Sequence, residues 1–169
     1  MNCPLDIDIL VSLVDEFLEP FGCDSDFDSD FSYDPEDERV YFSVLVSERS
    51  DRLFKQYIAR KFGFKVPSIF MMSLLHEVGH FYTLHTFSDF RMKTAHQAKK
   101  LIEAELEKLA PDDPAYDVVY SNYFDLSIEK VATVWAVNYY RKNKKRCDDF
   151  YLKFETELKR QYAELGLTE

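Results

Sequence analysis

The sequence predicts a mostly helical α+β domain with a small antiparallel sheet. Apolar residues recur at helical spacing through most of the chain, whereas residues 27–46 alternate apolar and polar side chains as strands do. Hydrophobic residues make up 46% of the 169 residues, which is enough for one real core. The sequence contains no internal repeat and no linker, so we treat residues 1–169 as a single domain.

The N-terminal third is predicted to form a helix followed by a β-hairpin. Asp6–Glu19 carries its apolar residues on one helical face, and a proline and a glycine end the run. Phe27–Tyr33 and Val40–Val46 alternate as two strands around a turn at residues 34–37. Aspartates occupy the second face of the first arm and have low strand propensity, so a loop is the alternative for that arm.

Six further helices are predicted from apolar periodicity and from residues that favour helix ends. The first begins at Ser50 or Asp51 and ends before Gly63. Ser68 can cap the second, which continues as far as Phe87. The others are residues 89–108, which end before a proline-rich break, residues 116–123, residues 128–140 with Ser127 as N-cap, and residues 148–165.

Charge and hydropathy exclude several classes of protein. The net charge of −10 argues against a general nucleic-acid surface, because neutralising phosphates requires clustered lysine and arginine. The one basic run, residues 141–146, is interpreted as a helix C-terminus whose cations complement the helix dipole. No apolar run approaches the length of a membrane span. We therefore expect neither nucleic acid nor a membrane as a partner.

The cysteines and the N-terminus bear on the cellular compartment. Cys3, Cys23 and Cys147 lack the C-x-x-C spacing of many zinc sites, and their odd number is typical of reduced thiols. The N-terminus carries acids where a secretory signal requires lysine or arginine. The expected location is the cytoplasm, and no heptad pattern predicts an oligomeric state.

Residues 76–80 read His-Glu-Val-Gly-His, an H-E-x-x-H pattern. Residues four apart differ by about 40° around a helix axis, so His76 and His80 can direct both imidazoles at one zinc ion. Glu77 then lies beside the metal, where it can act as a general base. The pattern falls within the predicted helix at residues 68–87, as this chemistry requires.

A catalytic zinc site needs a third protein ligand and one open position. Glu129 is the leading candidate, because small residues at i+3, i+4 and i+7 share its helix face and permit close helix approach. Gly79 costs about 1 kcal/mol relative to alanine within a helix, a cost better understood if another backbone packs there. We therefore expect the 127–140 helix to cross the 68–87 helix at Gly79.

Four other residues are weighed as ligands. Asp125 is the main alternative to Glu129, and it could instead orient a histidine from outside the ligand set. Asp117 is a weaker choice. His85 lies half a turn away from the motif's helix face and is interpreted as a surface or packing residue. His96 lies beyond a break and could approach the site, although a solvated helix position is favoured.

Tyr120 and Tyr123 lie shortly before the helix that carries Glu129. Their hydroxyl groups are candidate hydrogen-bond donors to the oxyanion that forms during peptide hydrolysis. The alternative is an ordinary packing role, because tyrosines are also common on buried helix faces.

Together, the motif and the candidate ligand resemble small gluzincin-type zinc metallopeptidases of the ImmA/IrrE-like group. The resemblance rests on residues 76–80 and on residues 129–136, Glu-Lys-Val-Ala-Thr-Val-Trp-Ala, where the family has E-x-x-A before a Trp-Ala or similar pair. It implies a zincin-like domain whose small sheet packs near the active-site helix. It also implies that His76, His80 and Glu129 bind Zn²⁺ and that Glu77 is the base.

The resemblance has one further implication and one departure. It implies that an edge strand, here Val40–Val46, binds the substrate backbone by strand addition. Thermolysin-like gluzincins carry an acid four residues after the ligand glutamate, and here that position is Thr133. We therefore expect a residue other than Thr133 to orient a histidine ligand from outside the ligand set.

The sequence thus predicts an intracellular zinc metalloendopeptidase that acts on a protein or peptide substrate. Zinc would polarise the scissile carbonyl, and Glu77 would carry a proton from water to the leaving amine. The alternative is a regulatory or binding protein that keeps the zincin scaffold without cutting. The presence of both histidines and Glu77 favours the enzyme. A purely structural zinc site is less consistent, because such sites generally close all four positions.

Overall fold

The computed structural model describes residues 5–45, 48–110 and 112–167. Most of them are helical, which confirms the predicted mostly helical α+β class. The elements are α1 (Ile7–Leu18), η1 (Glu19–Phe21), β1 (Asp24–Phe27), β2 (Ser32–Asp34), β3 (Arg39–Phe42), α2 (Glu48–Phe62), α3 (Ile69–Thr83), η2 (Leu84–Thr86), α4 (Asp89–Leu106), α5 (Pro114–Phe124), α6 (Ser127–Lys142) and α7 (Lys144–Glu164).

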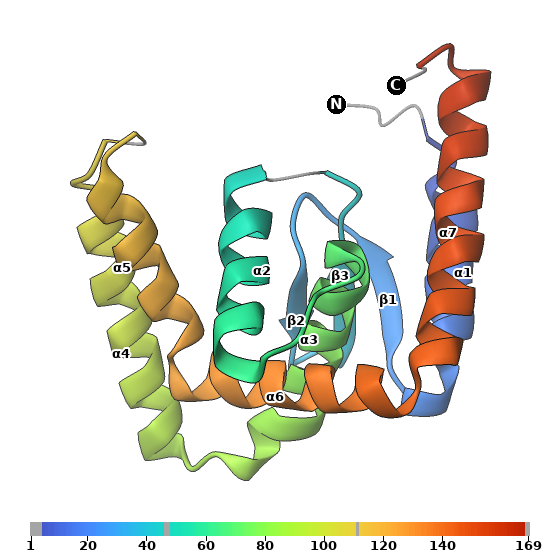
Figure 1. The fold of residues 1–169 in the computed structure, drawn as a ribbon. Helices are drawn as coiled ribbons and strands as arrows, with labels where there is room; N and C mark the ends of the chain where they lie inside the picture. Colours follow the sequence, from blue (N-terminus) through green and yellow to red (C-terminus); the bar gives the residue numbers. More distant parts are fainter. Residues whose placement is uncertain (1–4, 46–47, 111, 168–169) are drawn as a thin grey trace.

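The α3 helix lies at the centre of the molecule, between the sheet and α6 (Figure 1). The α1 and α7 helices lie side by side at one end, and α4 and α5 form an antiparallel pair at the other. Ten of the fifteen residues of α3 are buried, including polar ones. The sequence motif therefore lies inside the fold, with elements from both halves of the chain around it.

The sheet differs from the predicted antiparallel hairpin. Its order is β1-β3-β2; β2 and β3 are antiparallel across the predicted turn, but β1 runs parallel to β3. The sheet is therefore mixed. The aspartate-rich arm is divided into two strands, which lie on opposite sides of β3. An alternating pattern indicates which residues share a face, but it does not specify strand direction.

The position of β3 overturns the expected substrate-binding edge at Val40–Val46. This strand ends at Phe42, and both β1 and β2 pair with it, so its backbone is not free for strand addition. Ser43 to Leu45 follow the strand without regular structure, and Val46 lies outside the described residues. The sheet does pack against α3, as the fold prediction required.

Several predicted helix ends are confirmed, and others are wrong. Ser68 caps α3 by accepting a hydrogen bond from the Met71 amide, and Gly63 follows α2 with a φ of +57°. Ser50 and Asp51 lie inside α2, which begins at Glu48. Likewise, Ser127 is the first residue of α6 rather than its cap, and α7 begins at Lys144, earlier than predicted. Neither α6 nor α7 begins with a capping hydrogen bond from a side chain.

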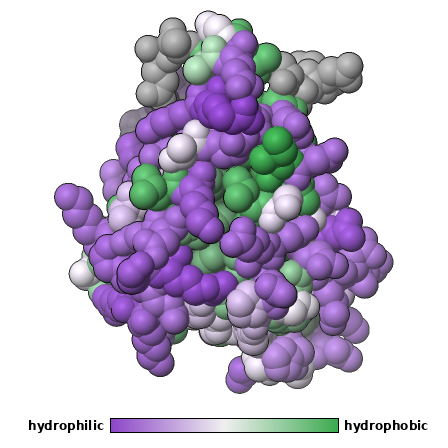
Figure 2. Space-filling model, turned by 90° about the vertical axis from the view of Figure 1, so that its right-hand side faces the viewer, coloured by the Kyte–Doolittle hydropathy of each residue, from purple (hydrophilic) through white to green (hydrophobic). Residues whose placement is uncertain are grey.

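The outer surface agrees with the acidic, polar composition. Figure 2 shows the face on which α1 and α7 lie, where hydrophilic side chains cover most of the surface and hydrophobic ones gather in patches. Along α7, salt bridges join residues three or four positions apart, including Lys145 to Asp149 and Lys159 to Glu155. None of the helices described here has both the length and the apolar character needed to cross a bilayer.

Two of the three cysteines lie within the described residues, and both are free thiols. Burial raises the pKa of Cys23 and of Cys147 to about 11, which keeps them protonated and unreactive near neutral pH. Both therefore pack as core residues, in agreement with the prediction of reduced thiols. Cys3 lies outside the described residues.

Candidate metal centre

The H-E-x-x-H motif lies on the buried middle of α3. His76, Glu77 and His80 are 7%, 8% and 8% exposed, respectively. Two histidines and a carboxylate are costly to bury unless each is paired or bound to a metal. Their burial therefore indicates that partners come from neighbouring elements.

The α6 helix supplies those partners by crossing α3 at Gly79, as predicted. A Cβ atom built at Gly79 would lie only 2.5 Å from the carbonyl oxygen of Ala132, which belongs to the α6 backbone. No residue with a side chain fits at this crossing. The small residues Ala132, Thr133 and Ala136 on α6 are all buried, which completes the close approach.

The crossing brings Glu129 to the two histidines. The Glu129 Oε2 atom lies 3.0 Å from His76 Nε2 and 3.2 Å from His80 Nε2, and the two Nε2 atoms lie 3.1 Å apart. These three residues form a buried group whose ligand atoms can meet at one metal ion. The predicted assembly of His76, His80 and Glu129 is thus present in the structure.

Thr133 determines which nitrogen of His76 faces this group. The Thr133 hydroxyl donates to the Glu129 carbonyl at 2.9 Å and lies 3.1 Å from His76 Nδ1. The single hydrogen of the hydroxyl is used in the first bond, so its oxygen accepts a hydrogen bond from the Nδ1–H group of His76 in the second. The Nε2 lone pair of His76 then points at Glu129 and His80. This contact corrects the expectation that support for a histidine would come from elsewhere than Thr133.

The donor atoms suit zinc. Zinc bound at about 2.0–2.1 Å in a tetrahedron holds its ligand atoms about 3.3 Å apart, close to the three separations found here. Burial acts to raise the pKa of Glu129, but the close contacts with His76 and His80 outweigh burial and hold that pKa below its usual range. Glu129 is therefore a carboxylate. A carboxylate oxygen and an imidazole lone pair aimed at one point are the donor chemistry of a cation site.

His80 differs from His76 in its outer contact. Its Nδ1 atom is buried and has no hydrogen-bond partner among the described residues. Metal-binding histidines usually donate the second ring N–H to a protein or water oxygen. Thr133 therefore orients His76. No described residue forms a hydrogen bond with the Nδ1 atom of His80.

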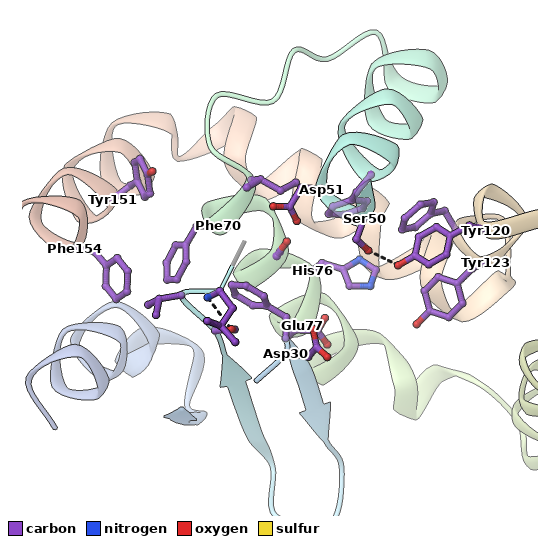
Figure 3. A pocket seen from close by; sticks show the side chains of 18 of the residues that line it. Asp30, Ser50, Asp51, Phe70, His76, Glu77, Tyr120, Tyr123, Tyr151 and Phe154 are labelled. Carbon is purple, nitrogen blue, oxygen red and sulfur yellow. Dashed lines mark hydrogen bonds between the residues drawn. The ribbon is translucent and has the colours of Figure 1, made fainter. Parts of the chain in front are cut away.

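An open cleft of about 620 Å³ leads to the centre. His76 and Glu77 line it, together with aromatic side chains from α3, α5 and α7 (Figure 3). In Figure 3, Phe70, Tyr151 and Phe154 lie toward one end, and Tyr120 and Tyr123 lie toward the other. His76 and Glu77 lie between these two groups of aromatic side chains.

Glu77 lines this cleft and is only 8% exposed. Its carboxyl group has no hydrogen-bond partner among the described residues. Burial raises the pKa of Glu77 above the ordinary carboxylate value, with the nearby histidines acting in the opposite direction. A carboxylate whose pKa is shifted toward neutral is a better proton acceptor and donor during catalysis. Glu77 is therefore a buried carboxyl group that adjoins His76 and faces the cleft.

Both candidate tyrosines line the same cleft. Burial and the charges of Glu129 and Glu77 raise the pKa of Tyr123 far above its usual range, and burial raises the pKa of Tyr120. Both phenols thus stay protonated and can donate hydrogen bonds. Tyr120 is bonded to the Ser50 hydroxyl, whereas the Tyr123 phenol faces Glu129 and is therefore the one directed at the centre.

The alternative ligands lie elsewhere. Asp125 pairs with Lys61 at 2.9 Å and accepts a hydrogen bond from Tyr57, so it neither binds the metal group nor orients a histidine. Asp117 pairs with two arginines of α2. His85 and His96 are exposed, as favoured by their sequence positions, and neither belongs to the metal group.

Sequence reasoning missed Lys99 on α4. This lysine lines the cleft, and its ammonium lies 5.4 Å from the centroid of the Tyr123 ring. In the sequence it is one of many charged residues on a polar helix, and nothing in that pattern separates it from the solvated ones. The packing of α4 against α5 places it in the cleft.

Comparison with protein-family models, with curated proteins and with solved structures finds no match to this chain. The resemblance to gluzincins therefore rests on the motif and on the residues around Glu129. The geometry shows that His76, His80 and Glu129 can share one metal ion.

The Thr133 contact makes a testable prediction. Thr133→Val removes the hydroxyl with little change in volume, so zinc affinity is expected to fall about 10- to 100-fold. Competition with a chromophoric chelator measures this change. Thr156→Val is the matched control, because Thr156 makes the same bond to a carbonyl four residues earlier but lies exposed on α7. Equal zinc affinity in the two variants would contradict the assigned role of Thr133.

Proposed function

We propose that this protein is a zinc-dependent endopeptidase of the gluzincin type. The observation that carries the proposal is the joint arrangement of His76, His80 and Glu129, together with the open cleft that His76 and the neighbouring Glu77 line. A closed structural zinc site would need no cleft and no free carboxylate at the metal. The open position and the base are the features that distinguish a hydrolytic site.

His76, His80 and Glu129 would hold the zinc ion. When bound, zinc lowers the pKa of water toward neutrality and polarises a carbonyl oxygen. Thr133 keeps the His76 lone pair directed at the ion through the Nδ1 contact. The charge of the ligand set, one carboxylate and two neutral imidazoles, leaves the centre with a net positive charge suited to this chemistry.

Glu77 moves the proton. It accepts a hydrogen from the attacking water as the water oxygen bonds to the carbonyl carbon of the scissile peptide. It then passes that proton to the amine nitrogen as the carbon–nitrogen bond breaks, which regenerates the carboxylate. Tyr123 can donate a hydrogen bond to the carbonyl oxygen, because burial and the nearby carboxylates keep its phenol protonated.

The lining of the cleft supports a polypeptide as substrate. Aromatic side chains of α3, α5 and α7 lie on either side of His76 and Glu77. Such a lining suits apolar side chains of a substrate. Cleavage within a polypeptide chain is therefore the reaction that we propose.

Metal content and chelation test the proposal. The purified protein is expected to contain close to one zinc per chain and to cut unfolded polypeptides. A chelator should abolish cleavage, and added zinc should restore it. Absence of near-stoichiometric zinc after purification without chelators would contradict the proposal. Stoichiometric zinc with binding but no Glu77-dependent cleavage would favour the regulatory scaffold instead.

A further inference from the structure

The cleft has an unusual charge distribution. Five carboxylates outside the metal-binding group line it, whereas Lys99 is the only lysine or arginine among the described residues of its wall. The carboxylates are Asp30, Asp51, Glu77, Glu103 and Glu155. Lys99 therefore has several carboxylates nearby with which it could form a salt bridge. Whether it does so decides if its charge is neutralised.

Lys99 pairs with none of these carboxylates. Among the described residues, lysines 61, 144, 145, 153 and 159 form salt bridges, but Lys99 does not. Its side chain is instead half-buried, with the ammonium 5.4 Å from the centroid of the Tyr123 ring. An ammonium over an aromatic face is attracted by the ring without being neutralised. Lys99 therefore keeps its charge available inside the cleft.

Lys99 shares the cleft with the metal centre. The same wall contains His76, Glu77 and Tyr123. The Lys99 ammonium lies over the Tyr123 ring, so this ring holds the cation inside the cleft that His76 and Glu77 also line.

We propose that Lys99 is an oxyanion-binding catalytic residue, with Tyr123 as the platform that holds its ammonium. This inference rests on the proposed peptidase function. As water adds to the scissile carbonyl, negative charge develops on the carbonyl oxygen, and an unpaired cation already in place stabilises it. The hydrogen bond is stronger than one from a neutral donor because the donor is charged.

The other role open to a cleft lysine is binding a permanent substrate carboxylate, such as a chain terminus. The remaining wall disfavours that role. A substrate carboxylate near Lys99 would also face the negative charges of the acidic lining, and like charges placed together cost affinity. The negative charge on the carbonyl oxygen develops only during the reaction. The bound substrate therefore does not suffer this repulsion from the acidic lining.

Steady-state kinetics of Lys99→Met test the proposal on a peptide that the wild type cuts. The kcat is expected to fall about 10²- to 10³-fold, as for loss of one oxyanion donor, with KM within about threefold. Lys99→Arg should recover part of the loss. Lys100→Met is the matched control, because Lys100 is the next residue on α4 and is exposed. A loss confined to KM, or no loss, would overturn the proposal.

Binding of a phosphinic peptide provides a readout independent of turnover. This ligand carries a negative oxygen where the oxyanion would develop. In zinc-loaded protein with Glu77→Gln, Lys99→Met should weaken phosphinic binding about 10- to 100-fold. Binding of the matched uncharged peptide should change less than about twofold, and zinc content and thermal midpoint should be unchanged. Equal weakening of both ligands, or no binding of the phosphinic peptide, would overturn the proposal.

The two measurements separate this inference from the proposed function. If the wild type cuts no peptide but Lys99 selectively strengthens phosphinic binding, the anion-binding role stands and the peptidase proposal fails. If cleavage depends on zinc and Glu77 while neither measurement depends on Lys99, the peptidase proposal stands and the role of Lys99 is wrong.

Discussion

The Glu77→Gln variant is expected to lose about 10²- to 10⁴-fold of its hydrolytic rate while binding zinc as the wild type does. Glutamine has nearly the same size and shape as glutamate, but its amide cannot accept and return the proton. The three ligand atoms belong to His76, His80 and Glu129, so the substitution leaves the metal-binding group intact. Zinc content and zinc affinity measure whether the variant still binds the metal, and kcat on one peptide measures the loss of hydrolysis.

Two controls make the Glu77 result specific. His80→Ala removes a ligand and is expected to lose both zinc and hydrolysis. Glu105→Gln makes the same chemical change at an exposed position of α4 and should behave as wild type. Hydrolysis by Glu77→Gln at the wild-type rate would show that another group moves the proton. Loss of zinc from that variant would place Glu77 among the ligands, contrary to the geometry found here.

The metal group could be predicted from sequence because its geometry depends on short-range helical spacing and on one packing constraint. His76 and His80 lie one turn apart on any regular helix, so their common direction follows from their positions alone. Gly79 has a cost in helix propensity that close packing explains, and the small residues beside Glu129 indicated the helix that packs there. The structure confirms that crossing at Ala132.

Thr133 shows where motif-based reasoning was incomplete. In the sequence, this position is notable only because it lacks the acid that thermolysin-like gluzincins carry there. A hydroxyl four residues after Glu129 can nevertheless donate to the Glu129 carbonyl and accept from His76 at the same time. The type of residue indicated only a missing carboxylate, whereas in the structure the Thr133 hydroxyl contacts His76 Nδ1.

The sheet order and Lys99 required the tertiary structure. The pairing of β1 with β3 depends on how the intervening chain folds back, and alternation in sequence carries no information on direction. In the sequence, Lys99 does not differ from other lysines of a polar helix. In the structure, α5 packs against α4 and places the Tyr123 ring next to the Lys99 ammonium. Long-range contacts of this kind do not leave a periodic signal in the chain.

Gly79→Ala is expected to lower the free energy of unfolding by about 2 kcal/mol or more, even though alanine favours the helix by about 1 kcal/mol. The new Cβ would lie 2.5 Å from the Ala132 carbonyl oxygen. This atom belongs to the backbone of α6, so no side-chain rotation can relieve the overlap. Urea unfolding of the metal-free protein measures the loss.

The same variant should also lose zinc affinity, because Glu129 lies one helical turn before Ala132 and must move with α6. The three ligand atoms are now only 3.0–3.2 Å apart, so a shift of α6 away from α3 separates the carboxylate from both histidines. Ala59→Gly, at an exposed position of α2, controls for helix propensity and should cost about 1 kcal/mol without affecting zinc. If Gly79→Ala is instead stabilised by its gain in propensity and keeps wild-type zinc affinity, α3 and α6 do not cross as closely as described. The third ligand would then need to be sought on another element.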